Sequence, residues 1–166
     1  SKTNGLLPQG YYPFDSNCIL QLNGWFTCDQ GTTYYQNGVM HGAGWDNIEG
    51  SFYYFDSNGY IVTGMVRVPY PTANLLPGYG PDAEDAEVNV PGKEGNPDNY
   101  DYPDRESALF VFDENGVFQK DQCGVYDDNG ITRWINNGML VWHAGLVKDG
   151  DDYRYFKRNG MVTSVE

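Results

Sequence analysis

The chain has 166 residues, of which 16% are aromatic and 21 are glycine, a composition that favours strands joined by turns. Ten basic and 23 acidic side chains give a formal net charge of −13, so phosphate backbones and anionic lipid surfaces would repel it. These numbers argue against a nucleic-acid partner, and no apolar run approaches the roughly 20 residues that a membrane-spanning helix needs. The acidic surface is compatible with neutral sugars, with cations such as choline, with Ca²⁺, or with charge that only keeps the chain soluble.

The N-terminal segment, SKTNGLLPQG, contains no signal-peptide core, so we expect the chain to be a module of something longer. The cysteines Cys18, Cys28 and Cys123 are odd in number and show no Cys-x-x-Cys spacing. This pattern argues against a disulfide framework and against a zinc site, although one bridge between Cys18 and Cys28 is conceivable.

A turn signal recurs along the whole chain. Asn-Gly, or Asn-Cys in the first copy, begins at Asn17, Asn37, Asn58, Asn115, Asn137 and Asn159. Asn-Gly accepts the positive φ angles of a tight hairpin turn, and aromatic strands precede it in most copies, as in GSFYYFDSNGYIVTG. All intervals but one are close to 21 residues, which indicates an internal repeat.

The repeat unit consists of Gly followed by Trp or an aliphatic residue, a polar turn, an aromatic strand, Asn-Gly and a hydrophobic pair. Four copies occupy residues 24–42, 44–64, 124–142 and 145–163, and the segments YYPFDSNCIL and LFVFDENGVF are partial copies. The sequence therefore predicts an all-β fold, a β-solenoid of stacked β-hairpin repeats of about 21 residues in which each hairpin covers its neighbour.

A Pro-rich acidic insertion interrupts the repeats, because seven of the nine prolines fall between Pro69 and Pro103. We expect N-terminal hairpin repeats over 1–66, the insertion over 67–106 and C-terminal repeats over 107–166, as one continuous repeat module. Prolines disfavour central strands, but the tyrosines and leucines of the insertion offer enough apolar surface to pack on the repeats. Both a mobile linker and an ordered excursion are compatible with this composition.

Residues 44–64 resemble the cell-wall-binding repeats of choline-binding and glucan-binding type, which occur in secreted proteins of Gram-positive bacteria. The resemblance covers about three quarters of the chain and implies a secreted, cell-wall-associated module that binds a cell-wall polymer or glycan, with a choline-decorated polymer among the candidates. In this family a quaternary ammonium group lies in a box of aromatic rings between hairpins, held by cation–π attraction. No unit of this chain keeps every wall of that box, and flat rings with nearby Asn and Asp also suit sugars.

Strand alternation places Phe52 and Tyr54 on one face, and alignment makes Thr33 and Tyr35 their equivalents in the first complete hairpin. We expect the best sites to combine Trp25 with Tyr35 and Tyr54, Trp45 with Phe52, and Tyr153 with Tyr155. Any one of these rings could instead belong to the core. The predicted ligand-binding residues are Trp25, Tyr35, Trp45, Phe52, Tyr54, Trp134, Tyr153 and Tyr155.

Enzymatic chemistry has no support in the sequence, which contains no nucleophile elbow, phosphate loop or metal-ligand cluster. We therefore expect no catalytic residue, no metal site, no cofactor and no membrane insertion. Two other functions stay open: an adhesin that binds a host protein through the insertion, and a repeat region attached to an enzyme domain outside this chain.

Overall fold

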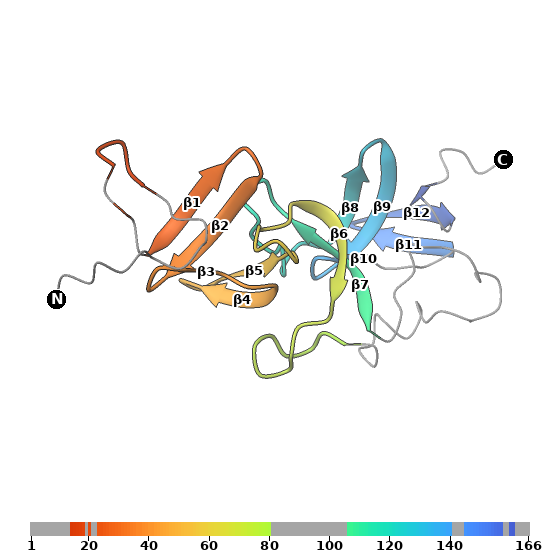
Figure 1. Ribbon diagram of the computed structural model, residues 1–166. Coiled ribbons are helices and arrows are strands. Elements are labelled where there is room, and N and C mark those ends of the chain that lie inside the picture. The colour runs from red at the N-terminus through yellow and green to blue at the C-terminus, as the bar shows by residue number, and fades with distance from the viewer. Residues whose placement is uncertain are drawn as a thin grey trace. The chain divides into compact units, whose positions relative to one another are not determined.

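The computed structural model describes residues 14–18, 20, 23–80, 106–140, 145–157 and 160–161, without the side chains of 145–149, 156–157 and 160–161. The chain divides into two compact units: unit 1 contains residues 1–44 and 55–61, and unit 2 contains residues 45–54 and 62–166. Strands and turns account for the regular structure of the described residues, and none of these residues is helical. The prediction of an all-β fold built from hairpins is thereby confirmed for this part of the chain (Figure 1).

The strands follow the sequence repeat closely. They form sheets with the orders β1-β2-β3, β4-β5, β6-β7-β10-β9-β8 and β11-β12-β13. Their bounds are β1 (Gly24–Cys28), β2 (Gly31–Gln36), β3 (Val39–Met40), β4 (Gly44–Ile48), β5 (Ser51–Phe55), β6 (Gly64–Pro69), β7 (Ser107–Phe112), β8 (Gly124–Asp128), β9 (Ile131–Asn136), β10 (Met139–Leu140), β11 (Gly145–Asp149), β12 (Asp152–Lys157) and β13 (Gly160–Met161).

The repeats that begin with β1, β8 and β11 are hairpins with a two-residue turn, followed by the short third strands β3, β10 and β13, whereas β4 and β5 form a two-stranded sheet. In the hairpin of β8 and β9, the turn residues Asn129 and Gly130 have φ angles of 50° and 89°, as a type I′ turn requires. The second turn of the same repeat, Asn137-Gly138, has φ angles of 49° and 74° and leads into β10, which pairs back onto β9. In the described residues the recurring Asn-Gly signal therefore falls in the second turn of a repeat, as at Asn37-Gly38 and Asn137-Gly138.

A backbone hydrogen bond of one type recurs within each unit, between one repeat and the next. In unit 1 the N–H of Ile61 donates to the carbonyl oxygen of Thr32 at 2.8 Å. In unit 2 the N–H of Phe118 donates to the carbonyl oxygen of Phe52, also at 2.8 Å. Ile61 and Phe118 occupy the same place in their repeats, because each is bridged to the last aromatic residue before its turn. The sequence repeat is thus matched by a repeated contact.

Turn glycines make the second recurring contact. A Cβ atom at Gly59 would lie 2.5 Å from the carbonyl oxygen of His41 in unit 1. In unit 2 a Cβ atom at Gly138 would collide with the carbonyl oxygen of Gln119. Both glycines also have positive φ, 84° and 74°, so the turn conformation and the close approach each favour glycine there.

The hairpin formed by β6 and β7 carries the insertion. Its register runs from Gly64 opposite Phe112 to Pro69 opposite Ser107, so the connection between the two strands begins only after Pro69. Arg67, Val68 and Pro69 therefore belong to a strand, although the sequence analysis assigned them to the insertion. Proline is tolerated in β6 because this strand lies at the edge of its sheet.

The first part of the connection between β6 and β7 packs into the core of unit 2, to which it belongs. Leu76 is only 7% exposed and belongs to the main core cluster, with Tyr70 and Tyr79 packed against it. The N–H of Tyr70 donates to the carbonyl oxygen of Glu106 at 3.2 Å, which joins the two ends of the connection. Residues 81–105 lie outside the described residues. The buried members of the cluster are Val68, Leu76, Ala108, Phe110, Phe112, Phe118 and Met139.

All three cysteines are free thiols, so the conceivable bridge between Cys18 and Cys28 is absent. The Cys28 thiol donates instead to the side-chain oxygen of Gln30 at 3.1 Å. The repeats are consequently held by backbone pairing and aromatic packing rather than by a disulfide.

Candidate aromatic binding site

The most exposed tryptophan in the described residues is Trp25 on β1, which is 41% exposed. The hairpin register places Trp25 opposite Tyr34 on β2, and their ring centroids are 5.1 Å apart with an edge-to-face angle of 67°. The ring of Phe55 lies nearly parallel to that of Trp25, at 6.2 Å and 12°. Trp25 is therefore supported by two other rings while much of its own surface stays open.

A second stacking contact holds Phe55 in place. The ring of His41, which follows β3, stacks on Phe55 with a centroid distance of 3.7 Å and an angle of 17°. Phe55 is fully buried, and Nδ1 of His41 lies against the carbonyl oxygen of Gly42. The rings of Phe55 and His41 form a fixed support behind Trp25, and neither residue was among the predicted site residues.

The predicted partnership of Trp25 with Tyr35 is wrong by one residue. Tyr35 lies opposite Gly24, is 1% exposed, and packs edge-on against Phe26 at 6.3 Å. Neighbouring residues of a strand point to opposite faces, so Tyr34 shares the face of Trp25 and Tyr35 faces the core. The position that Tyr54 holds in β5 is therefore held by Tyr34 in β2.

Trp45 on β4 has a different environment. Its indole N–H donates to the carbonyl oxygen of Pro69 at 2.6 Å, and its ring meets that of Tyr54 edge-on at 5.7 Å. The rings of Phe110, Phe112 and Phe118 surround it at 5.2, 5.4 and 5.3 Å. Side chains of the same unit thus cover the surface that Trp25 leaves open.

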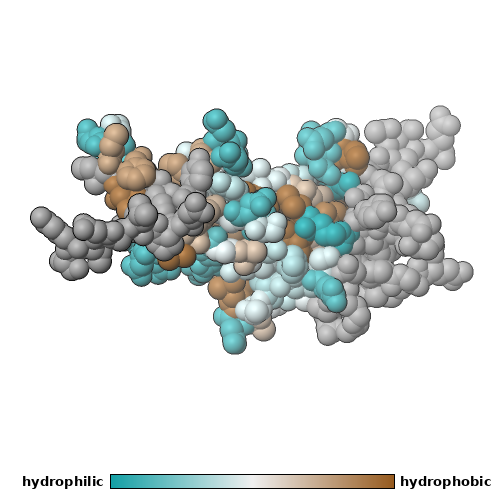
Figure 2. Space-filling model, in the orientation of Figure 1, coloured by the Kyte–Doolittle hydropathy of each residue, from teal (hydrophilic) through white to brown (hydrophobic). Residues whose placement is uncertain are grey.

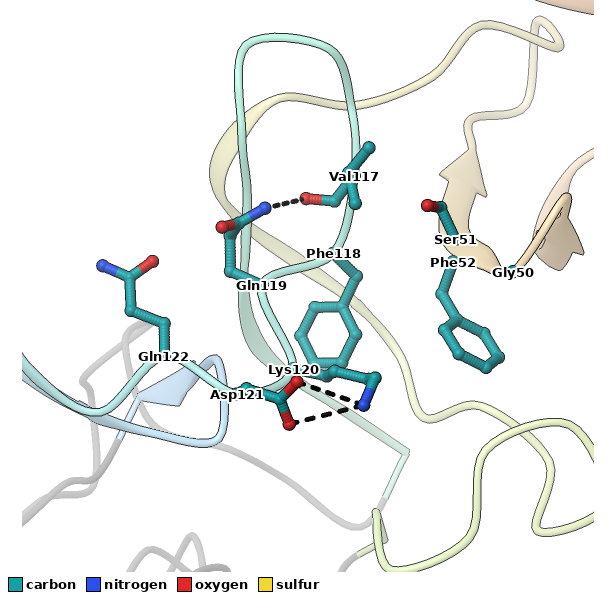
Figure 3. Close-up of a pocket in the computed structure, with 9 residues that line it drawn as sticks. All are labelled: Gly50, Ser51, Phe52, Val117, Phe118, Gln119, Lys120, Asp121 and Gln122. Carbon is teal, nitrogen blue, oxygen red and sulfur yellow. Dashed lines mark hydrogen bonds and ion pairs between the residues drawn. The ribbon is translucent and has the colours of Figure 1, made fainter.

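Phe52 and Tyr54 are half-buried and pack against the main core cluster of unit 2. Phe52 also lines a hollow of about 290 Å³, the Phe52 hollow, which lies between residues 50–52 and residues 117–122. Figure 3 shows the ring of Phe118 pointing toward Lys120, whose ammonium group pairs with both carboxylate oxygens of Asp121 at 3.3 and 3.2 Å. Trp45 and Phe52, which were predicted to form a site together, thus both pack against the same phenylalanine-rich cluster. Phenylalanine side chains already occupy part of the space next to Trp45.

The C-terminal hairpins repeat the same register with other residues. Trp134 lies opposite Val125, and Tyr155 lies opposite Leu146. Trp134 and Tyr155 thus hold the position of Tyr34, and the two aliphatic residues hold the position of Trp25. Tyr153 is 66% exposed and Tyr155 is 36% exposed, whereas Trp134 is half-buried. The structure places Tyr153 and Tyr155 on one face of β12, as the alternation of the sequence predicted.

On the visible surface, hydrophobic residues do not form one continuous apolar patch. On the face shown in Figure 2, they lie in small groups separated by hydrophilic residues. Small, separated apolar groups of this kind present less contiguous apolar area than a large protein interface needs.

Two charged features lie on the hairpin of β8 and β9. Nε of Arg133, which is 6% exposed, donates to Asp128 at 2.9 Å, so this buried cation is paired. Burial, with smaller contributions from Asp128 and Asp127, raises the pKa of Tyr126 above its ordinary value. Neither Arg133 nor Tyr126 lines the Phe52 hollow, so we assign both features to the packing of this hairpin.

The described part of the chain contains no group of three or more His, Cys, Asp or Glu residues that could hold a metal ion. Among the same residues, no helix is long and apolar enough to cross a membrane.

No family model matches the sequence, and no curated protein matches it significantly. Solved structures do resemble the fold. The autolysin LytC from Streptococcus pneumoniae, solved with a synthetic peptidoglycan ligand, matches 92% of this chain with a TM-score of 0.51 and 14% identity. Choline-binding protein F from the same organism, solved in the presence of a peptidoglycan analogue, matches 93% with a TM-score of 0.47 and 17% identity.

A third similar structure is the pneumococcal cell-wall endolysin from phage Cp-1 complexed with choline, with 85% of this chain covered, a TM-score of 0.46 and 20% identity. The chain spans only 27%, 39% and 31% of these three proteins. The match to LytC shows that the chain shares its fold with part of that autolysin, and the two lower scores add no argument of their own.

Proposed function

We propose that the chain is a non-catalytic module that binds a cell-wall polymer or glycan and so anchors a secreted bacterial protein at the cell wall. The observation that carries this proposal is the exposed ring of Trp25, supported by Tyr34 and Phe55. A large exposed ring that is held rigidly by its neighbours loses little conformational entropy when a ligand stacks on it.

The open ring suits two kinds of cell-wall group. A quaternary ammonium such as choline would gain about 0.5–2 kcal/mol from cation–π attraction to the ring. A pyranose ring would stack its C–H face on the same surface, with its hydroxyl groups directed to solvent. The net charge of −13 favours the cation over any anionic group.

Stacking of the hairpins into a β-solenoid is the architecture that we infer from the recurring contacts. The Ile61 to Thr32 and Phe118 to Phe52 hydrogen bonds each join one repeat to the next within a unit. Exposed rings would then recur along the stack, with Trp25 near the N-terminus and Tyr153 and Tyr155 near the C-terminus. Several weak sites along one polymer would add their affinities through a high effective concentration.

The similarity to LytC supports the same proposal at the level of the ligand class, since that protein was solved with a synthetic peptidoglycan ligand. Because a quaternary ammonium and a pyranose ring both suit the open face of Trp25, choline and the glycan strand are the two ligands that a first experiment should compare.

Sedimentation of the full chain with purified cell walls, with and without their choline-bearing polymers, tests the proposal. We expect Trp25→Ala to weaken the apparent affinity for the cell walls about tenfold, the loss that corresponds to roughly 1.4 kcal/mol of ring contact. Val39→Ala is the matched control, because Val39 is a 68% exposed apolar residue of the same unit that makes no ring contact with Trp25. The proposal fails if folded wild-type protein does not sediment with either preparation, or if both variants bind equally well.

A further inference from the structure

A second hollow, of about 300 Å³, lies in unit 2 where the start of the insertion meets two loops of the repeats. Residues 76–79 form one wall, Lys120 and Asp121 form another, and Asn136, Asn137 and Met139 complete it. We call it the Tyr79 hollow. Its volume is at the lower end of the range for small-ligand pockets, which fits a single ring rather than a large ligand.

Tyr79 gives the hollow a fixed shape. Its hydroxyl group is 2.8 Å from the carbonyl oxygen of Asn137 and 3.2 Å from that of Lys120, which joins the insertion to both loops. Its ring packs against those of Phe110 and Phe118 at 6.0 and 5.4 Å. A ligand would therefore enter a site that is already formed, without first ordering a loop.

The lining combines one apolar wall with uncharged polar groups. Leu76 and Met139 are 7% and 2% exposed and contribute the apolar wall together with the ring of Tyr79. Asn136 and Asn137 add side-chain amides, whose Oδ1 atoms accept from the Cys123 thiol at 3.0 and 3.6 Å and whose NH₂ groups are hydrogen-bond donors. We propose that the Tyr79 hollow binds one ring of a neutral pyranose sugar, with the apolar wall against its C–H face and the amides toward its hydroxyl or acetamido groups.

The charges of the lining argue against a phosphate ligand, and its single half-buried ring argues against a quaternary ammonium ligand. Lys120 is the cation of the lining and Asp121 its anion, and they pair with each other at 3.2 Å, so the hollow carries no net charge. A phosphate would meet the carboxylate of Asp121 beside that lysine, in a chain of net charge −13. A quaternary ammonium would find one half-buried ring rather than an open ring face, which distinguishes this hollow from the Trp25 surface.

The Phe52 hollow adjoins the Tyr79 hollow, because Lys120 and Asp121 line both. Figure 3 shows the same ion pair beside the ring of Phe118. A second ring of the same oligosaccharide would occupy the Phe52 hollow, with the half-buried ring of Phe52 as its apolar surface. The site lies entirely within unit 2 and does not depend on the proposed role of Trp25.

The test is a titration of the full chain, labelled with ¹⁵N, with a tetramer of β-1,4-linked N-acetylglucosamine, with maltotetraose and with choline. We expect one of the two sugars to shift the backbone amide signals of Tyr79, Asn136 and Asn137, and choline to leave these signals unchanged. Trp25→Ala should not alter the sugar-induced shifts, so a failure of the proposed cell-wall function at Trp25 can be told apart from a failure of this site.

Asn137→Gly removes one amide of the hollow and keeps the turn, because Asn137 has a φ of 49° and glycine adopts that angle freely. We expect the affinity for the sugar to fall about tenfold. Asn37→Gly is the matched control: Asn37 has a φ of 51° and precedes a glycine in the equivalent turn of unit 1.

Three results would overturn the inference: no shift with either sugar at these amides, a shift at the same amides with choline, or equal effects of Asn137→Gly and Asn37→Gly. A selective loss in Asn137→Gly, with the melting temperature of both variants alike, would support it.

Discussion

The hairpins that carry Trp25 and Trp45 begin with the same Gly-Trp pair and place the indole opposite or beside a tyrosine, yet the two tryptophans have different surroundings. The ring of Trp25 contacts Tyr34 and Phe55 and is 41% exposed. The ring of Trp45 contacts Tyr54 and three phenylalanines, and its N–H is bonded to the chain at Pro69.

The different surroundings of the two tryptophans show that the Gly-Trp motif alone does not define a binding site. Whether the ring is available depends on the residues that the same unit packs against it, and unit 2 supplies Phe110, Phe112 and Phe118 for that purpose. A tryptophan with a full set of neighbours stabilises the fold, whereas one with an open face is available to a ligand.

The largest expected effect separates the two tryptophans by stability. Trp45→Ala removes a ring from the centre of an aromatic cluster and leaves a cavity, which should lower the free energy of unfolding by about 3–5 kcal/mol. Trp25→Ala removes a partly exposed ring and should cost about 1–2 kcal/mol by its smaller buried area. Denaturant unfolding of both variants, followed by circular dichroism, measures the difference. Equal losses would contradict the view that the ring of Trp45 is packed against the core cluster while that of Trp25 is largely open.

A smaller effect tests what the two units have in common. Gly59→Ala and Gly138→Ala each force a Cβ atom against the carbonyl oxygen of the preceding repeat and also strain a positive φ, so each should cost about 3 kcal/mol. Gly130→Ala is the control, because its φ of 89° is similar but no atom lies within 4 Å of the added Cβ. We expect about 1–2 kcal/mol for the control. Thermal unfolding that gives the same loss for all three variants would argue against a shared contact between repeats.

The smallest expected effect concerns the buried polar side chain at one hairpin position, which differs between the two units. Thr33 is 1% exposed and its Oγ1 has no hydrogen-bond partner among the described residues, whereas Arg133, at the same hairpin position in unit 2, is paired with Asp128. Thr33→Val should therefore raise the free energy of unfolding by about 1 kcal/mol, since an unsatisfied buried hydroxyl group is replaced by a methyl group of similar volume.

Thr32→Val is the control for this prediction, because the hydroxyl group of Thr32 is 2.9 Å from that of Thr27. Its loss should be neutral or slightly destabilising in the same unfolding measurement. Stabilisation by Thr32→Val and not by Thr33→Val would show that the unpaired hydroxyl group is not a weakness of unit 1.

The hairpin repeat was predictable from the sequence because its signals are local. Asn-Gly turns and aromatic strands specify where each chain reversal falls, and the observed strands follow that spacing. The error over Tyr35 arose because two glycines with different roles were aligned. Gly31 is the first residue of β2 and pairs with Cys28, whereas Gly50 lies in the turn before β5 with a φ of 88°. A one-residue shift moves every side chain to the other face.

The surroundings of each ring could not be predicted in the same way, since they depend on contacts between distant segments. Phe118 follows Trp45 by more than 70 residues, with the insertion between them, and nothing local indicates that these two rings meet. The Tyr79 hollow has the same origin, because it forms only where the start of the insertion packs back on two later loops. The ligand-binding roles of Trp134, Tyr153 and Tyr155 stay predictions.

The indole N–H signals of the four tryptophans give the most direct test of the central claim, that Trp25 presents a ligand-binding ring and Trp45 does not. Each signal can be followed in ¹H–¹⁵N spectra while choline and then soluble cell-wall fragments are added to the full chain. We expect the Trp25 signal to move in a saturable way and the Trp45 signal to stay in place. Movement of the Trp45 signal with the Trp25 signal unchanged would contradict the claim.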